Sequence, residues 1–209
     1  MIGCREEKAP YCIVYEYCPH GNLREYLVGL HKEVKRIDEY ELEDVTFNLL
    51  CNFASQIASG MAFLGEIECI HRALAARNIQ VWHDNVCKIS EFGFSSKVLD
   101  VNTYEKMIEG RLPVRWMALE SILECVYTEK CDVWSFGIVL WEIYNFGKQP
   151  YPDMSTKDVI RELQHGYRLP RPHYCDDVVH SIMVECWQDE PGDRPTFEEL
   201  VTSIGQNYM

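Results

Sequence analysis

The sequence is short of positive charge. Its 209 residues include 33 acidic and 20 basic side chains, which gives a formal net charge of −13. An acidic protein repels nucleic-acid phosphates and anionic lipid head groups. We therefore expect no nucleic-acid partner and no electrostatic attachment to a membrane. The charge carries no information about the fold.

The sequence also lacks the cysteine and histidine spacings of metal sites. Its ten cysteines include no C-x-x-C pair, and its seven histidines include no H-E-x-x-H motif. Because the number of cysteines is even, a disulfide framework is one interpretation. Cys51 and Cys186 lie in apolar segments, which favours the other interpretation, small core residues in a reducing compartment.

No hydrophobic run has the length of an obvious membrane span or signal peptide. The most apolar stretch, residues 136–141, is too short to cross a bilayer and is followed by Glu142. The residues after Met1 include Glu and Lys, in place of a basic start and an apolar run. These absences predict a soluble, cytoplasmic chain with no membrane segment.

The sequence pattern predicts a mainly α-helical fold with a few strands near the N-terminal end. Residues 11–17 are β-branched and aromatic, and residues 78–81 and 86–89 are two further strand candidates. The charged residues 31–44 predict an exposed insertion. A solvated loop is the simpler interpretation of this insertion, and a partner-binding segment is the alternative.

Helical spacing of apolar residues identifies the main helices. One helix is predicted to begin near Thr46, because six apolar residues then recur on one face: Leu49, Leu50, Phe53, Ile57, Met61 and Leu64. Residues 132–144 are the most apolar helix candidate and are expected at the buried centre. Capping boxes predict helix starts at Ser155 and Thr196, and residues 90–120 are expected to be mostly loop.

Six motifs occur in the order and at the spacing of the protein tyrosine kinases. Residues 71–78 (H-R-A-L-A-A-R-N) resemble the catalytic loop, and residues 91–93 (E-F-G) resemble the magnesium-binding D-F-G motif. Residues 112–118 are similar to the loop that binds the protein substrate, and 118–120 (A-L-E) to the A-P-E motif. The central helix and the closing segment of the family are matched by residues 132–137 and 186–197.

The sequence is therefore identified as a member of the tyrosine kinase family, most similar to the fibroblast-growth-factor, platelet-derived-growth-factor and Tie receptor groups. The resemblance implies one tyrosine-kinase-like domain over residues 1–209. It implies that residues 1–18 are the hinge and the last strands of the small lobe, and that residues 19–209 are the larger C-terminal lobe. Members of the family use ATP and magnesium to phosphorylate protein tyrosines.

The catalytic motifs depart from the family pattern. Ala73 stands where the family has the Asp that accepts the proton of the substrate hydroxyl, although Arg72, Arg77 and Asn78 match the catalytic loop. Glu91 replaces the Asp of D-F-G, and its carboxylate reaches one methylene further. Asn78 and Glu91 are thus the expected magnesium ligands, in a site of weakened geometry.

The nucleotide pocket implied by the resemblance is also altered. Glu16 and Cys18 are expected at the hinge beside the adenine, and Tyr15 at the gatekeeper position, where its ring would fill the space behind the adenine. Gln80 stands where the family usually has a leucine, so a covering base would desolvate a polar amide. The sequence contains no G-x-G-x-x-G loop and no matching strand lysine. We expect poor binding of both ATP and magnesium.

Other matched residues are expected to support the fold or its regulation: His71, Phe92, Gly93, Tyr104, Glu120, Asp132 and Arg194. The resemblance implies a buried ion pair between Glu120 and Arg194. It also implies that Asp132 holds the backbone of the catalytic loop, and that His71 and Phe92 stack onto the central helix.

Two tyrosines have a regulatory interpretation and a structural one. Tyr104 lies in the activation loop, where Arg72 would receive its phosphate; the alternative is an ordinary exposed loop tyrosine. Residues 151–154 (Y-P-D-M) resemble a phosphotyrosine docking motif, but the fold is expected to place a structured loop there.

These observations predict a catalytically impaired kinase-like domain, a pseudokinase. It would act as a binding, scaffold or regulatory module in receptor tyrosine kinase signalling, with other kinase domains or signalling adaptors as partners. Such a module would lie in the cytoplasm as the intracellular part of a plasma-membrane receptor. One alternative is part of a receptor tyrosine kinase with weak residual activity once its N-terminal lobe is present. Another is a gene fragment with no independent role.

Overall fold

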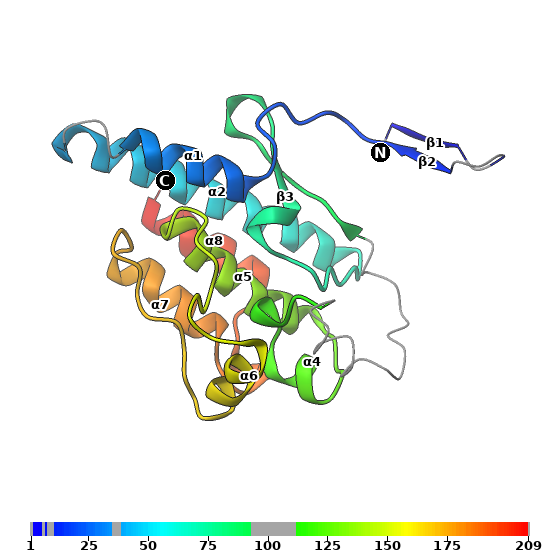
Figure 1. Cartoon of the computed structure of the whole chain (residues 1–209), viewed down its shortest axis with the longest axis vertical. Coiled ribbons are helices and arrows are strands. Elements are labelled where there is room, and N and C mark those ends of the chain that lie inside the picture. Colours follow the sequence, from blue (N-terminus) through cyan, green and yellow to red (C-terminus); the bar gives the residue numbers. More distant parts are fainter. Residues whose placement is uncertain (1, 6, 8–10, 35–38, 93–111, 209) are drawn as a thin grey trace.

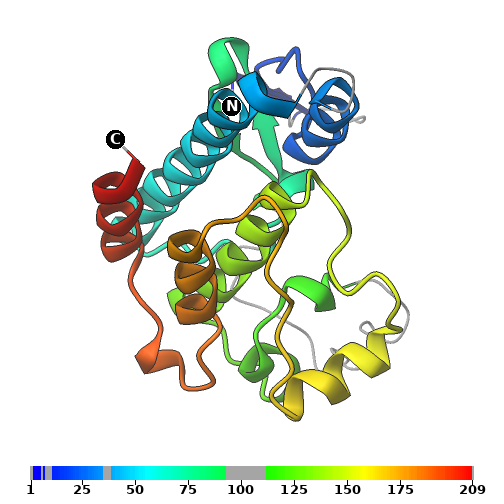
Figure 2. The same cartoon turned by 90° about the vertical axis from the view of Figure 1, so that its left-hand side faces the viewer.

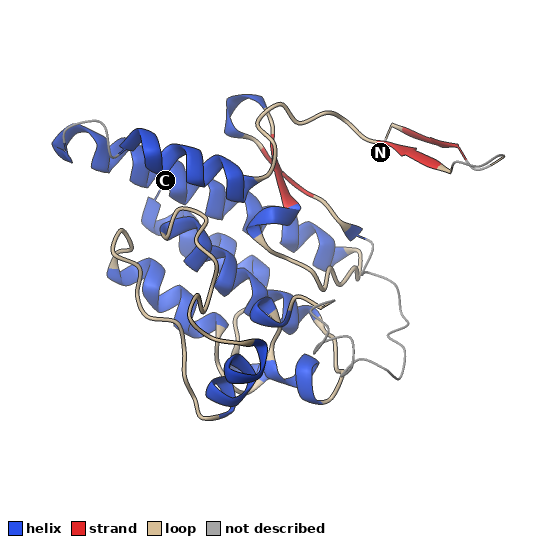
Figure 3. Ribbon diagram, viewed as in Figure 1, coloured by secondary structure: helices blue, strands red, loops and turns tan. Residues whose placement is uncertain are grey.

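The computed structural model describes residues 2–5, 7, 11–34, 39–92 and 112–208, with backbone alone for residues 39–45 and 207–208. The described chain is mainly α-helical, as predicted, and the helices form one body from which the first two strands project (Figures 1 and 3). Its helices are α1 Leu23–Val34, α2 Glu39–Glu66, α4 Leu119–Leu123, α5 Glu129–Tyr144, α6 Thr156–Gln164, α7 Asp177–Cys186 and α8 Phe197–Tyr208.

The strands form two separate antiparallel pairs. β1 (Gly3–Arg5) pairs with β2 (Cys12–Val14), with Cys4 opposite Ile13. β3 (Ile79–Val81) pairs with β4 (Cys87–Ile89), with Gln80 opposite Lys88. The three strand regions expected from the sequence are therefore present, each shorter than its apolar run.

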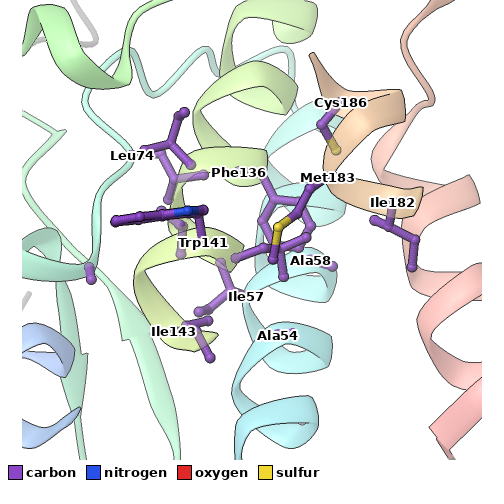
Figure 4. Close-up of a cluster of buried hydrophobic side chains, with 14 of the residues drawn as sticks. Ala54, Ile57, Ala58, Leu74, Phe136, Trp141, Ile143, Ile182, Met183 and Cys186 are labelled. Atoms are coloured by element: carbon purple, nitrogen blue, oxygen red, sulfur yellow. The ribbon is translucent and has the colours of Figure 1, made fainter. Parts of the chain in front are cut away.

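Helix α5 is the centre of the core. Every residue from Cys131 to Tyr144 is buried. α5 packs against α2 on one side and α7 on another, and α2 also packs along α8 (Figure 2). Figure 4 shows the apolar side chains that join these helices, among them Ile57, Phe136 and Met183. The predicted centre of the fold is confirmed.

The charged residues 31–44 differ from the exposed loop that the sequence predicted. Residues 31–34 continue α1, and α2 begins at Glu39, seven residues before Thr46, so the backbone of much of 31–44 is helical. The reason is that residues with good helix propensity, such as Glu and Leu, extend a helix. Residues 35–38 lie outside the described part of the chain. The capping boxes at Ser155 and Thr196 are both present.

One helix among the described residues, Thr46–Glu66, is long and apolar enough to cross a membrane by length and composition. The sequence prediction considered only residues 136–141 and missed it. The face of α2 that carries Leu50, Phe53 and Ile57 is buried in the core. A buried core helix passes the same test of length and composition, so the finding is weak evidence for a membrane span.

The ten cysteines form no disulfide. The second interpretation, small core residues, holds for four of them, whereas three others are exposed. Cys51, Cys131, Cys175 and Cys186 are buried. Burial raises the pKa of the Cys87 and Cys175 thiols to about 12. A thiol held protonated at neutral pH is a poor nucleophile, so these cysteines serve packing.

Gly137 of α5 should be difficult to replace. A Cβ atom there would lie 2.5 Å from Nε1 of Trp187 and 2.8 Å from Cβ of Cys186. We expect Gly137→Ala to destabilise the protein by about 1–3 kcal/mol through overpacking, measured by urea unfolding. Gly29→Ala is the control, because open space surrounds Gly29 in α1 and alanine favours a helix by about 1 kcal/mol. Equal effects of the two variants would contradict this description of the α5–α7 contact.

Candidate active site

The catalytic-loop backbone is held by a buried carboxylate from α5. Asp132 is 1% exposed and accepts hydrogen bonds from the backbone N–H groups of His71, at 2.7 Å, and Arg72, at 2.8 Å. Arg72 has a φ of +65°, a left-handed conformation that is costly for a residue with a Cβ. The two hydrogen bonds hold that turn. Burial raises the pKa of Asp132 to about 7, while these N–H groups and the Arg72 charge oppose the rise.

His71 links the catalytic loop to the E-F-G segment. Its Nε2 lies 2.9 Å from the carbonyl oxygen of Ser90, and its Nδ1 lies 3.3 Å from the backbone N–H of Ala73. The pair of contacts fits a neutral ring that donates from Nε2 and accepts at Nδ1. Burial lowers the pKa of His71, against smaller effects of the Ser90 carbonyl and Glu91. Phe92 packs edge-on against His71 with ring centroids 5.1 Å apart and is 42% exposed. The expected stacking of both rings on the central helix stays a prediction.

A second buried acid joins the catalytic loop to the substrate loop. Glu142, at 0% exposure, accepts hydrogen bonds at Oε2 from the backbone N–H of Ala76 and from Nε1 of Trp116, both at 2.9 Å. Its Oε1 is buried without a hydrogen-bond partner. Burial raises the pKa of Glu142 to about 7. Sequence reasoning assigned this residue no role, although an acid directly after the most apolar stretch, residues 136–141, was a usable signal.

The altered catalytic residues share one open cavity of about 550 Å³. Ala73, Asn78 and Glu91 all line it. The Asn78 side chain donates a 2.6 Å hydrogen bond to the carbonyl oxygen of Ala73, and Ser90 Oγ donates one of 2.8 Å to the carbonyl oxygen of Asn78. The structure thus brings together the residue that replaces the base and both expected magnesium ligands.

Asn78 and Glu91 would supply only some of the ligands that magnesium requires. Glu91 is exposed and has a φ of +67°. Within the described residues, no group of three or more His, Cys, Asp or Glu side chains is arranged to hold a metal ion. Magnesium at Asn78 and Glu91 would therefore need waters or substrate phosphates for the rest of its octahedron, which is its usual mode of binding.

The substrate loop forms the other wall of this cavity. Arg115 donates hydrogen bonds to the carbonyl oxygens of Pro150, Tyr151 and Met154, with lengths of 2.9 Å to Pro150 and 2.6 Å to Met154. Tyr151 is 2% exposed. Residues 151–154 are thus a structured loop with a buried tyrosine, as the structural interpretation held.

The side chain of Arg77 stacks on Trp116 at the wall of the cavity. The Arg77 guanidinium carbon lies 4.0 Å from the centre of the Trp116 ring. Burial lowers the pKa of Arg77, with the Glu142 charge raising it and the Arg24 charge lowering it by smaller amounts. Arg77 is therefore a partly desolvated cation at the cavity wall.

An ion pair between Arg194 and Glu120 supports the substrate loop. Arg194 donates to Glu120 at 2.6 Å and 3.0 Å, in a bidentate geometry. Burial alone would raise the pKa of Glu120, but the hydrogen bonds and charge of Arg194 outweigh it and hold the pKa below its ordinary value. The pair expected from the resemblance is present.

The hinge residues are more exposed than a nucleotide pocket requires. Tyr15 is 65% exposed, so its ring fills no buried space behind an adenine, contrary to the expectation. Glu16 forms an ion pair with Lys88 of β4, which sequence reasoning missed. Gln80 in β3 bridges to Asn22 in the chain that follows the hinge, and Cys18 is partly buried.

Two regulatory candidates, Gly93 and Tyr104, lie outside the described residues. The expected pairing of Arg72 with a phosphate on Tyr104 is thus not part of the described structure. Arg72 instead lies 4.9 Å from the ring centre of Tyr127. Tyr127 had no role in the sequence prediction.

The arrangement of Asp132, the loop from His71 to Asn78, Glu91 and the Glu120–Arg194 pair is that of a kinase C-terminal lobe. The sequence profile of the family described as "Protein tyrosine and serine/threonine kinase" matches residues 1–204. The chain belongs to this kinase family. Its mainly helical fold is the corresponding C-lobe-like part.

Two receptors are similar over nearly the whole chain. The fibroblast growth factor receptor of Hydra vulgaris is 39% identical over 204 residues, which cover 98% of this chain and 25% of the receptor. The tyrosine kinase receptor Cad96Ca of Drosophila melanogaster is 40% identical over 205 residues, 98% of this chain and 26% of the receptor. The chain thus spans about a quarter of these relatives and is a receptor-tyrosine-kinase-like domain segment.

Glu142 should make stability depend on pH. The folded state keeps the Glu142 proton up to about pH 7, and the unfolded state only up to the ordinary pKa of 4.5. Stability is therefore lost as pH rises through this window, by an order of about 3 kcal/mol. In Glu142→Gln the side-chain carbonyl still accepts both hydrogen bonds but has no charge to desolvate.

We expect Glu142→Gln to reduce the pH dependence of urea unfolding between pH 4.5 and 7 by about half, because Asp132 contributes with the same sign. Glu124→Gln, which removes an exposed carboxyl, is the control and should leave the slope unchanged. A wild-type stability that rises with pH through this window would contradict the account of Glu142.

Proposed function

We propose that this chain is a catalytically impaired kinase-like domain that serves as a binding or regulatory module in receptor tyrosine kinase signalling. The observation that carries the proposal is Ala73. This residue lines the cavity and stands at the position where the family has its catalytic Asp.

The chemistry lacks its base. In phosphoryl transfer a carboxylate orients the attacking hydroxyl and accepts its proton, and losing such a positioned group lowers the rate by about 10²–10⁴. The Asn78 side-chain N–H is already bonded to the carbonyl oxygen of Ala73. That amide orients the loop but is no proton acceptor. Tyrosine phosphorylation by this loop is therefore slow at best.

ATP and magnesium are the cofactors of the family, and we propose that this chain binds both poorly. Glu91 keeps the charge of the magnesium-binding residue, but its longer side chain stands on an exposed, left-handed turn. Magnesium demands near-ideal octahedral geometry. The exposed Tyr15 and the polar Gln80 give an adenine ring little apolar cover.

The supporting frame favours a binding role. Asp132, Glu142 and the Glu120–Arg194 pair keep both walls of the cavity in place. The substrate loop 112–118, fixed through Arg115, is the surface we assign to a protein partner. Such a partner would be another kinase domain or a signalling adaptor, on the cytoplasmic side of a membrane receptor like those that the chain resembles.

A weakly active kinase is the alternative. Asn78, Arg77 and the carboxylate of Glu91 all line the cavity that holds Ala73, so much of the apparatus is in place. If the rest of a kinase is supplied, the two functions differ only in rate.

A chimeric receptor distinguishes the proposed binding module from a weakly active kinase. The chain replaces the matching 205 residues of the Drosophila receptor, and magnesium-dependent phosphorylation of a tyrosine peptide is measured. We expect a rate no higher than that of the same chimera with Asn78→Ala. Ala73→Asp should then raise the rate by about 10²–10⁴, because it restores the base.

The Ala73→Asp chimera also serves as the folding control, because activity requires a folded domain. Turnover of the unmodified chimera well above its Asn78→Ala version would contradict the proposal and favour the weak kinase. If Ala73→Asp stays inactive, the double variant with Glu91→Asp tests whether magnesium binding is the second defect. An inactive but folded double variant would show that Ala73 and Glu91 do not explain the loss.

A further inference from the structure

The absence of a carboxylate at Ala73 leaves the cavity more positive. Among the described residues, its charged lining residues are Arg24, Arg77, Arg115 and Glu91, a formal balance of +2. The chain as a whole carries −13. Restoring the family Asp at Ala73 would halve the positive balance. The cavity is therefore a local cationic site in an acidic protein, and a concave site with one sign of charge concentrates ligands of the opposite sign.

The three arginines differ in how they are held. Arg115 is fixed by hydrogen bonds to three backbone carbonyls, so its charge is preorganised. Arg77 is stacked on Trp116 and partly desolvated. Arg24 is exposed, and its Nε donates to the carbonyl oxygen of Gly147 at 3.2 Å. A ligand in the cavity would meet two anchored cations and a third, exposed one.

The cavity no longer suits a neutral phenol. A tyrosine hydroxyl would find the Ala73 methyl where a carboxylate should accept its proton, and an unpaired polar group in a partly buried site costs about 1–3 kcal/mol. An aryl phosphate needs no acceptor, because its oxygens accept from guanidinium groups. Its phosphoryl group carries a charge of about −1.5 to −2 at neutral pH.

The apolar wall favours an aromatic ester over a small anion. Leu112, Pro113, Val114 and Trp116 line the same cavity as the arginines, and the volume of about 550 Å³ exceeds what inorganic phosphate needs. A phenyl ring beside the Trp116 indole would bury apolar surface on both sides.

We propose that this cavity binds the phosphotyrosine side chain of a partner protein. The proposal rests on the proposed function, because an active kinase would hold a carboxylate at residue 73. An active kinase would transfer phosphate to a tyrosine at this site. In the present proposal, the site instead binds a tyrosine that another kinase has already phosphorylated.

Two acidic groups near the cavity would repel a bound phosphate, and one of them provides a further test. Glu91 lines the cavity itself, and Glu142 lies buried behind Trp116, hydrogen-bonded to its indole N–H. Glu91 is exposed, so it can turn away from an anion at modest cost. Removing its charge should strengthen binding, whereas a cavity built around magnesium would lose its ligand.

The test is fluorescence anisotropy of a fluorescein-labelled peptide with one phosphotyrosine, titrated with the 209-residue chain. The unphosphorylated peptide and a phosphoserine peptide of the same sequence are the comparisons. We expect the phosphotyrosine peptide to bind at least tenfold more tightly than either. Inorganic phosphate should compete far less well than phenyl phosphate.

Four variants and one control variant assign the binding to this cavity. Arg77→Gln and Ala73→Asp should each weaken phosphopeptide binding about tenfold, because one removes a cation and the other restores an anion. Glu91→Gln should strengthen it severalfold. Arg24→Ala should weaken it, while Lys32→Ala, which removes the same charge about 12 Å further along α1, should not. Circular dichroism and thermal unfolding confirm that each variant is folded.

Equal affinity for the three peptides would overturn the proposal, as would wild-type binding by Ala73→Asp. Competition by inorganic phosphate as strong as by phenyl phosphate would reduce the cavity to a general anion site and also overturn it. These outcomes leave the proposed loss of catalysis intact, because that claim is read from phosphoryl transfer by the chimera. Turnover in the chimera would overturn the proposed function whether or not the peptide binds.

Discussion

The structure depends on one buried carboxylate. Asp132 accepts two backbone N–H groups of the catalytic loop from within the most buried helix of the protein. A buried carboxylate is costly unless its oxygens are hydrogen-bonded, and a left-handed turn at Arg72 is costly unless it is held. The two hydrogen bonds between Asp132 and the loop offset both costs. The position of the loop, and of Ala73, Asn78 and the cavity, follows from this contact.

The frame and the chemistry are separable in this chain. The contacts of Asp132, Glu142 and Arg194 involve backbone groups and neighbouring side chains and none requires a base at residue 73. The proposed loss of the base at Ala73 would therefore remove a reaction step without removing a support. The cavity and its positive charge are the physical basis of both the proposed binding role and the inferred preference for a phosphorylated tyrosine.

Much of the fold was predictable because it rests on periodicity. The apolar spacing of α2, the apolar run of α5 and two capping boxes fixed the main helices, and the motif resemblance located Glu120, Asp132 and Arg194. Three kinds of feature were not predictable. The start of α2 in a charged segment depends on weak propensities. The exposure of Tyr15 depends on tertiary packing. The contacts of Glu142 and Arg115 join residues far apart in the sequence, which no local pattern reports.

Amide hydrogen exchange tests the central claim most directly, that Asp132 anchors the loop that carries Ala73. The backbone N–H groups of His71 and Arg72 are predicted to exchange within about tenfold of the slow amides of α5, since both are bonded to a side chain of that helix. Asp132→Asn should release them selectively. Exchange of these two amides in the wild-type chain at the rate of exposed loop amides would contradict the account.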